Sequence, residues 1–238
     1  MPRHQLSRES RPEILDGETW TLEELRSNLR DIRRVNRLGG GTSAVMRELP
    51  SLFHDISPER TVEVLDVATG SADIPLAIAK WANRNRRQIR LIVSDWSEDV
   101  LTIAKEEVGD RVGFQFSRLD AREVQLPDQS VDIVLCSLAL HHFDPANAVR
   151  VLAEMKRISR VGCLVNDLVR SRSGHLAAIM IAKLLTQNRL TRHDAPLSVL
   201  RAYTDEELRS LLVEAGWEGA LVQRRPLFRM TAVWRRPQ

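Results

Sequence analysis

The sequence predicts an α/β protein in which helices cover both faces of a mostly parallel sheet. Short apolar segments of strand length alternate along the 238-residue chain with segments whose apolar residues recur at helical spacing. This alternation is typical of a parallel sheet with helices on both faces. The last two strand-like segments follow each other without a helix between them, so we expect them to close the sheet as an antiparallel pair.

The expected elements follow one another in a regular order. The first strand runs into a helix at 73–83, the second precedes a helix at 98–107, and the fourth precedes a helix with regularly spaced apolar residues. Thr204 and Glu207 have the spacing of a capping box, which predicts a helix that stops at Gly216. The expected strands are 62–67, 89–94, 112–117, 131–136, 162–168, 220–223 and 229–234.

Two segments lie outside this regular pattern. We expect residues 1–50 to form a helical segment that covers the functional site, with the glycines 39–41 as a hinge, and residues 51–238 to form the main domain. The insertion 170–202 contains "HLAAIMIAKLLTQ", a helix that is apolar on more than one face. Such a helix needs two partners, or one partner and an apolar ligand, so it is either a lid over a substrate or ordinary core. The polar residues expected near its opening are His175, Arg192, His193 and Tyr203.

Composition excludes several classes of protein. The formal net charge is +3, and arginines are spread between acids along the chain, so we expect no nucleic-acid partner. The most apolar helical stretch is about half a membrane span, and no targeting segment is evident, which predicts a cytoplasmic protein. Cys136 and Cys163 fall in apolar runs and are expected to be buried free thiols. No metal site is expected.

The stretch "VLDVATGSADIP" has the outline of a strand that runs into a nucleotide-binding turn. It lacks the repeated glycines of a dinucleotide turn and offers Ala68, Gly70 and Asp73 instead. Asp66 and Asp73 would repel a phosphate dianion. A carboxylate together with backbone amides at a helix start suits the α-amino acid end of S-adenosylmethionine, which is therefore the expected cofactor.

Further acids follow the next two strands. Asp95 closes the second strand, where a carboxylate can accept both hydroxyls of a ribose, and Trp96 can cover the adenine face. Asp120 follows the third strand, where it can accept from the adenine amino group while the amide of Ala121 donates to a ring nitrogen. Each acid alone is equally well explained as a helix cap or a surface turn. Three acids that end three successive strands favour a cofactor site.

These stretches resemble the motifs of class I S-adenosylmethionine-dependent methyltransferases. The resemblance rests on "VLDVATGSADIP", "SDWSEDVLTIAKEE", "LDARE" and "LPDQSVDIVLCSLALHHF", and it includes Ser137 among the cofactor residues. Within that superfamily the chain is similar to the quinone-ring and small-molecule (type 11-like) methyltransferases, although Ala72 stands at a usual glycine position. The resemblance implies a Rossmann-like seven-stranded sheet with one reversed strand and the cofactor across the carboxyl ends of the first strands.

Candidate groups for the chemistry lie outside the cofactor motifs. His141 and His142 come just after the fourth strand, beside the expected position of the sulfonium. An imidazole there can act as general base for a hydroxyl acceptor. His142 is the preferred catalytic residue and His193 the second candidate, while either histidine of the pair can instead be a packed or capping residue.

The preferred function is transfer of a methyl group from S-adenosylmethionine to a small, partly apolar acceptor. A phenolic or polyketide-like hydroxyl, of the kind found in secondary metabolism, is the expected acceptor, which makes the reaction an O-methylation. C-methylation of a quinone-like ring is the nearest alternative. An RNA methyltransferase and a non-catalytic cofactor-binding module stay open as further classes, and the oligomeric state is not predicted.

Overall fold

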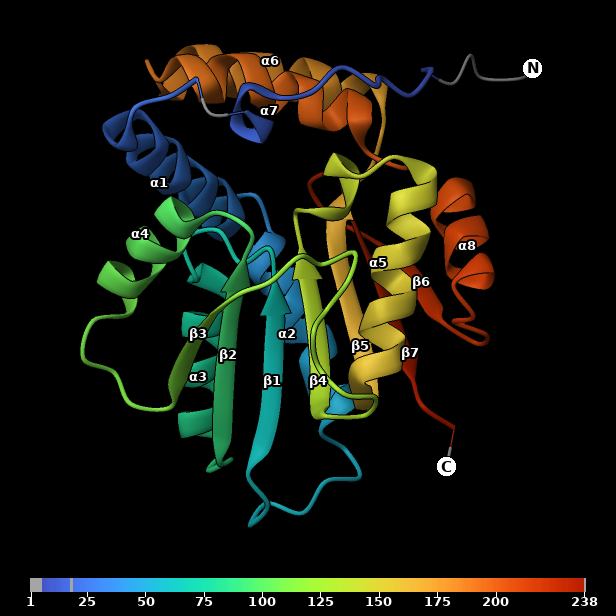
Figure 1. Cartoon of the computed structure of the whole chain (residues 1–238). Coiled ribbons are helices and arrows are strands. Elements are labelled where there is room, and N and C mark those ends of the chain that lie inside the picture. Colours follow the sequence, from blue (N-terminus) through green and yellow to red (C-terminus); the bar gives the residue numbers. More distant parts are fainter. Residues whose placement is uncertain (1–5, 18, 238) are drawn as a thin grey trace.

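The computed structural model describes residues 6–17 and 19–237. In these residues seven strands form one sheet in the order β3-β2-β1-β4-β5-β7-β6, which agrees with the expected α/β fold (Figure 1). Strands β1 to β5 are parallel, and β7 runs antiparallel to both of its neighbours, so it is the one reversed strand. The strands are β1 (Val62–Val67), β2 (Ile89–Asp95), β3 (Phe114–Arg118), β4 (Val131–Ser137), β5 (Ser159–Leu168), β6 (Leu221–Arg225) and β7 (Arg229–Arg235).

Helices cover both faces of this sheet. The α-helices are α1 (Leu22–Leu38), α2 (Gly41–Leu52), α3 (Asp73–Arg84), α4 (Glu98–Val108), α5 (Pro145–Ile158), α6 (Arg172–Leu185), α7 (Arg189–Arg201) and α8 (Asp205–Glu214), and two short 3-10 turns are Ile14–Asp16 and Leu140–His142. Thr204 and Glu207 form the expected capping box at the start of α8. No described helix is long and apolar enough to cross a membrane.

The structure differs from the expected elements in three places. β3 begins at Phe114 because Val112 is 94% exposed and Gly113 has a positive φ of 87°, which turns the chain before the strand. β5 begins earlier than expected, at Ser159, where a register shift lets it pair with the start of β4. The insertion contains a second helix, α7, that was not expected. Its interior Pro196 is a residue that usually breaks a helix, so the sequence pattern does not predict one there.

Apolar side chains fill the space on both faces of the sheet. On one face, α5 and α8 pack against β4 and β5 around residues such as Leu152 and Trp217, whose indole N–H donates to the carbonyl of Leu152 (2.9 Å). On the other face, α2 and α3 pack around Leu49 and Ile78. Both cysteines are buried free thiols, as expected, and burial raises the pKa of Cys163 to about 12 and that of Cys136 well above its usual value.

The carboxyl ends of the strands point toward a layer made of α1, α6 and α7 (Figure 1). Buried polar contacts join α1 to α7: the amide of Asn28 donates to the hydroxyl of Thr191 (3.1 Å), which donates to Asp31 (3.0 Å). The segment 6–17 crosses the same side of the molecule and bonds to α7 through Ile14 and Leu15. Any group bound at the strand ends therefore lies beneath this layer.

Candidate active site

The turn between β1 and α3 has the tight geometry that its sequence predicts. Ala68, Gly70 and Ala72 all have positive φ values, of 52°, 56° and 57°. Asp66 is buried at the end of β1 and accepts a hydrogen bond from the hydroxyl of Thr69 (2.7 Å). Alanine at two left-handed positions is uncommon. These residues bring the start of α3 close to the end of β1.

The end of β2 meets this turn directly. The carboxylate of Asp95 accepts hydrogen bonds from the amide of Gly70 (3.2 Å) and from the amide of Ser97 (3.1 Å). Trp96 is 60% exposed, and the guanidinium of Arg118 lies 4.9 Å from the centroid of its ring. The structure therefore brings together two groups, Gly70 and Asp95, that the sequence assigned separately to the cofactor.

The other expected cofactor residues lie at neighbouring strand ends. Asp120 pairs with Arg122 through several hydrogen bonds, the shortest of 2.7 Å, and this pairing lowers the pKa of the carboxyl. Ala121 beside it is buried. Ser137 ends β4, and its hydroxyl accepts from the amide of Asn166 (2.7 Å).

The cofactor turn carries a concentration of negative charge. Burial, together with the charges of Asp73 and Asp95, raises the pKa of Asp66 to about 7, although the hydrogen bond from Thr69 opposes this shift. Burial also raises the pKa of Asp73 and of Asp95. Asp73 is the first residue of α3 and accepts from the side-chain amide of Asn36 on α1 (3.0 Å).

Buried polar atoms at this turn lack partners among the described residues. They are one carboxylate oxygen of Asp66 and the hydroxyl of Ser71. An unpartnered carboxylate oxygen between two other acids suits an ammonium group, whereas a phosphate would be repelled. The residues present therefore fit the amino acid end of S-adenosylmethionine.

A second group of charged residues surrounds the turn after β4. Nδ1 of the buried His141 lies 2.7 Å from a carboxylate oxygen of Asp167, and the backbone amide of His141 donates to the other oxygen (2.9 Å). Its Nε2 lies 3.7 Å from Glu13 of the N-terminal segment. Burial opposes the ionisation of Asp167, but the charge of His141 and the hydrogen bond from it lower the pKa of the Asp167 carboxyl.

His142 lies between two carboxylates. Its Nδ1 is 2.5 Å from Asp16, and its Nε2 is 3.8 Å from Glu13. Burial disfavours the imidazolium, but the charges of Glu13 and Asp16 and the hydrogen bond that the ring donates to Asp16 outweigh it and raise the pKa of His142 to about 9. The carboxyl of Asp16 correspondingly has a pKa well below its ordinary value, in spite of burial. His142 therefore carries a proton at neutral pH in this structure.

Arg201 of α7 holds this group together. Its guanidinium donates to Asp16 (2.7 Å) and to the carbonyls of Arg11 (2.9 Å) and His142 (2.6 Å). Glu13, His141 and His142 place ligand atoms within 4.8 Å of one another, as a metal site would. The guanidinium of Arg201 lies 3.9 Å from Glu13, and this fixed positive charge opposes a divalent cation, so a proton is the better occupant.

The N-terminal segment reaches the same turn through a second arginine. Arg8 donates to the carbonyls of Phe143 (2.7 Å), His141 (3.0 Å) and Arg201 (2.7 Å). Its guanidinium lies 4.3 Å from the ring centroid of Tyr203, whose hydroxyl donates to the carbonyl of Phe143 (2.7 Å). Tyr203 is therefore a buried packing residue, and the expectation that it lies at an opening is not met.

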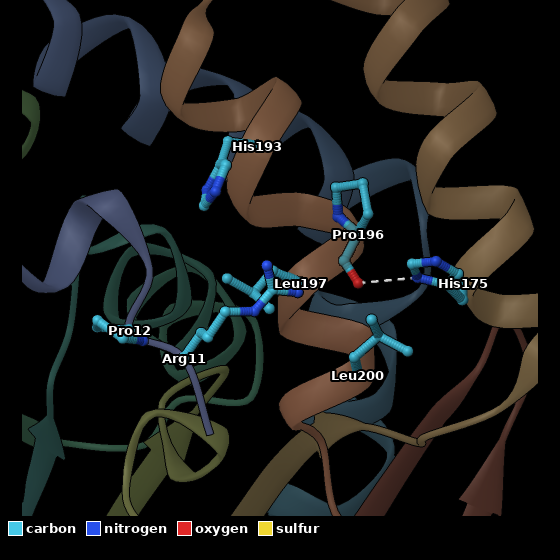
Figure 2. Close-up of a pocket in the computed structure, with 7 residues that line it drawn as sticks. All are labelled: Arg11, Pro12, His175, His193, Pro196, Leu197 and Leu200. Atoms are coloured by element: carbon cyan, nitrogen blue, oxygen red, sulfur yellow. Dashed lines mark hydrogen bonds between the residues drawn. The ribbon is translucent and has the colours of Figure 1, made fainter. Parts of the chain in front are cut away.

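His193 lies apart from His142, in a pocket of about 380 Å³ between the N-terminal segment and α6 and α7 (Figure 2). It is half exposed and pairs with Asp194 (2.7 Å), which also accepts from the amides of Ile14 and Leu15. Arg192 is exposed and donates to the carbonyl of Thr186 (2.8 Å). The pocket is lined by Arg11, Pro12, His175, His193, Pro196, Leu197 and Leu200.

Sequence reasoning missed four residues of the histidine group, namely Glu13, Asp16, Asp167 and Arg201. Asp167 lies near the end of β5, so the rule that singled out Asp66 and Asp95 at strand ends would also have found it. Glu13 and Asp16 are more than 120 residues from His142 in the chain, and no local pattern marks them.

Comparisons with known proteins agree with this geometry. Residues 64–162 match the model of a family described as "Methyltransferase domain". A ubiquinone/menaquinone biosynthesis C-methyltransferase UbiE from Rickettsia bellii is 30% identical over 175 residues, which are 68% of this chain and 70% of that protein. A relative of the same name from Rickettsia massiliae is 35% identical over 106 residues, covering 41% of this chain and 43% of its own.

Solved structures share the fold at low sequence identity. A SAM-dependent methyltransferase from Aquifex aeolicus has a TM-score of 0.61 at 16% identity and covers 88% of this chain and 97% of its own. Human N-acetylserotonin methyltransferase, solved in complex with SAM, has a TM-score of 0.64 at 16% identity and covers 92% of this chain and 57% of its own. Together with the acid-ended strands and the unpartnered atoms of the cofactor turn, these similarities show that the chain belongs to the class I S-adenosylmethionine-dependent methyltransferases.

Proposed function

We propose that this methyltransferase acts on the hydroxyl of a small, partly apolar phenolic or polyketide-like acceptor. The observation that carries the proposal is His142, held between Glu13 and Asp16 directly after β4. Burial raises the pKa of Asp95, and the charge of His142 is close enough to oppose part of that rise. A proton-accepting group therefore lies next to the expected cofactor position, which is what O-methylation of a weakly acidic hydroxyl needs.

The chain supplies the groups that would hold the cofactor. S-adenosylmethionine, when bound, supplies a methyl group activated by a sulfonium. Asp66 and Asp73 are the acids that would receive its ammonium, and Asp95 is placed for the ribose hydroxyls. The residues proposed for the adenine and the remaining contacts are Ala68, Gly70, Trp96, Asp120, Ala121 and Ser137.

We propose that neutral His142 takes the proton of the acceptor hydroxyl. The raised pKa of His142, about 9, lies near that of a phenol, about 10. A proton can then pass between the two groups at little cost in free energy. Because the base must be neutral, the rate is expected to rise with pH toward 9. Glu13 and Asp16 then stabilise the imidazolium that forms.

C-methylation of a quinone-like ring is the second candidate. The similarity to proteins named C-methyltransferases favours it. Loss of a ring hydroxyl proton also activates the ring carbon, so the same histidine can serve either reaction. His193, in the pocket beneath the insertion, is the second candidate base.

We also propose that residues 1–50 and the insertion 170–202 cover the acceptor. The contacts of Arg8, Glu13 and Asp16 with the turn after β4 support this, as does the attachment of α7 to the N-terminal segment through Asp194. Polar substitution of the insertion should then abolish methyl transfer while cofactor affinity persists.

The experiment that tests the proposal is methyl transfer to a panel of alkylated phenols and quinols, with the site of methylation read from mass fragments. His142→Gln should lower turnover by roughly 10² to 10⁴ fold with cofactor binding retained. His54→Gln is the matched control, because His54 is exposed and also pairs with a neighbouring aspartate. Methylation on ring carbon would replace the O-methylation proposal. Unchanged turnover in both His142→Gln and His193→Gln would remove histidine base catalysis.

A further inference from the structure

Helix α6 exposes an unusually large apolar surface. The helix packs against α7, and only Gly174 and Ala182 of its residues are fully buried. Five large apolar side chains are exposed, and at about 100° per residue they spread over roughly half of the helix circumference. This α6 apolar face consists of Leu176, Met180, Ile181, Leu184 and Leu185, which are 58%, 53%, 43%, 77% and 67% exposed.

The turn between β6 and β7 extends this surface. A Cβ placed on Gly174 of α6 would lie 3.2 Å from Cγ of Phe228, so the turn touches the start of the helix. Leu227 and Phe228 are 57% and 38% exposed and have φ values of 59° and 60°. Hairpin turns with two left-handed residues favour Asn-Gly, and large apolar residues there are strained. Two partly exposed apolar side chains therefore occupy a strained turn beside α6.

The charged side chains of α6 itself are all basic. α6 contains Arg172 and Lys183 and no acidic residue, and Arg192 follows on α7. Within residues 6–17 and 19–237, no carboxylate forms an ion pair with these three side chains. A twofold dimer through this face would set like charges against each other. An apolar surface bordered by unpaired cations matches an anionic lipid interface.

We propose that the α6 apolar face, with Leu227 and Phe228, docks into the surface of a lipid bilayer that contains anionic headgroups. The leucine and methionine side chains enter the boundary between headgroups and acyl chains, and Arg172 and Lys183 contact the headgroups. α6 lies on the side to which the strand ends point, above the turn that carries His142 (Figure 1). An apolar acceptor could then pass from the bilayer to the site without crossing water. This consequence rests on the proposed function, whereas the docking itself does not.

Vesicle flotation tests the proposal with the full chain. The protein should float with vesicles of phosphatidylcholine mixed with phosphatidylglycerol and bind less well to phosphatidylcholine alone. Added salt should weaken the binding. The double variant Met180→Glu, Leu184→Glu should bind at least about tenfold more weakly. Each of its two substitutions removes one large apolar side chain that would be buried in the bilayer. Val213→Glu is the matched control, since Val213 is 67% exposed on α8, and it should bind like the parent protein.

Two measurements keep the outcomes distinct. Calorimetric titration with S-adenosylhomocysteine should give equal affinities for the parent and both variants, which shows that they are folded. Equal flotation of the double variant and the parent would overturn the proposal, as would a parent that ignores both kinds of vesicle. A parent that is dimeric in light scattering, with a monomeric double variant and no flotation, would assign the face to self-association instead. Failure of methyl transfer with flotation intact would count against the proposed function alone.

Discussion

The carboxylates on the two sides of the site have pKa values that are shifted in opposite directions. On the cofactor side, burial raises the pKa of Asp66, Asp73 and Asp95, and none of the three forms an ion pair with a described residue. On the other side, where we propose that the acceptor binds (the acceptor side), Asp16 and Asp167 have lowered pKa values because each faces a histidine, and Asp16 also faces an arginine. The carboxylates are thus without ion pairs on the cofactor side and ion-paired on the acceptor side.

This difference distinguishes residues suited to binding a ligand from residues that hold the folded chain together. A group of buried acids without an ion-pairing cation favours a cationic ligand, because the ligand relieves both their repulsion and their desolvation. The acceptor side already contains its cations, Arg201 and protonated His142, so its charges hold the N-terminal segment to the turn after β4. Substitutions on the first side should therefore affect ligand affinity, and those on the second should affect stability and proton transfer.

The largest expected effect comes from Arg201→Met. The substitution keeps the apolar volume but removes one donor from the Asp16 carboxylate and the donors to the carbonyls of Arg11 and His142, while the carbonyl of His141 keeps its bond from Arg8. The free energy of unfolding should fall by about 3 kcal/mol, the scale for losing hydrogen bonds of a buried charged group. Urea denaturation followed by circular dichroism measures it.

Arg189→Met is the control for this change. Arg189 pairs with Glu24, but half of its side chain is exposed and water screens the pair, so the loss should be much smaller than in Arg201→Met. Equal losses in both variants would show that the acceptor side is no better compensated than the surface, and the comparison would not hold.

The residues expected to hold the cofactor could be proposed from the sequence because they lie in local motifs. Asp66 and Gly70 share one strand and turn, and Asp95 ends the adjacent strand, so strand periodicity alone brings them to one edge of the sheet. The fold followed from the same periodicity. The boundary of β3 was wrong because Gly113 turns the chain, and α7 was missed because Pro196 interrupts its pattern.

The acceptor side was predicted only through its histidines. His142 was found from its position after β4, but Glu13, Asp16 and Arg201 come from segments that reach the turn only in the folded chain. Their partners are 59 or more residues away, so neither spacing nor composition indicates the contacts. The raised pKa of His142 depends on these contacts, so it could not be predicted from the sequence either.

Asp95→Ala tests the cofactor side. We expect binding of S-adenosylmethionine to weaken by roughly 1.5 to 3 kcal/mol, the scale for a hydrogen bond to a charged group, which is about a 10-fold to 150-fold rise in Kd. Calorimetric titration measures this change, and NAD should not bind to either protein. Asp99→Ala is the control, because Asp99 is exposed on the next helix. If Asp95→Ala binds like the parent, the assignment of this acid to the ribose is wrong.

The smallest expected effect, and the most specific, is a change in pH dependence in Asp16→Asn. His142 has a folded-state pKa of about 9, above its ordinary value of 6.5. Its protonation therefore contributes stability that is fully present below about pH 6.5 and is lost as the pH rises through 9. Without the charge of Asp16 the pKa of His142 falls, because one of the two carboxylates that favour the imidazolium is gone.

Two consequences distinguish this effect from a general loss of structure. The destabilisation of Asp16→Asn should be larger at about pH 6 than at about pH 10, where His142 is mostly neutral in both proteins. Loss of the contact between Asp16 and Arg201 acts at both pH values and cancels in that difference. The pH at which kcat/KM rises should also move toward neutrality, because more of the neutral base is present. NMR titration of the His142 ring measures the shift directly, with Asp55→Asn, beside exposed His54, as a control that leaves it unchanged. An unmoved His142 titration in Asp16→Asn would mean that burial and Glu13 set its pKa, and that the acceptor side owes its charge balance to Glu13 and Arg201.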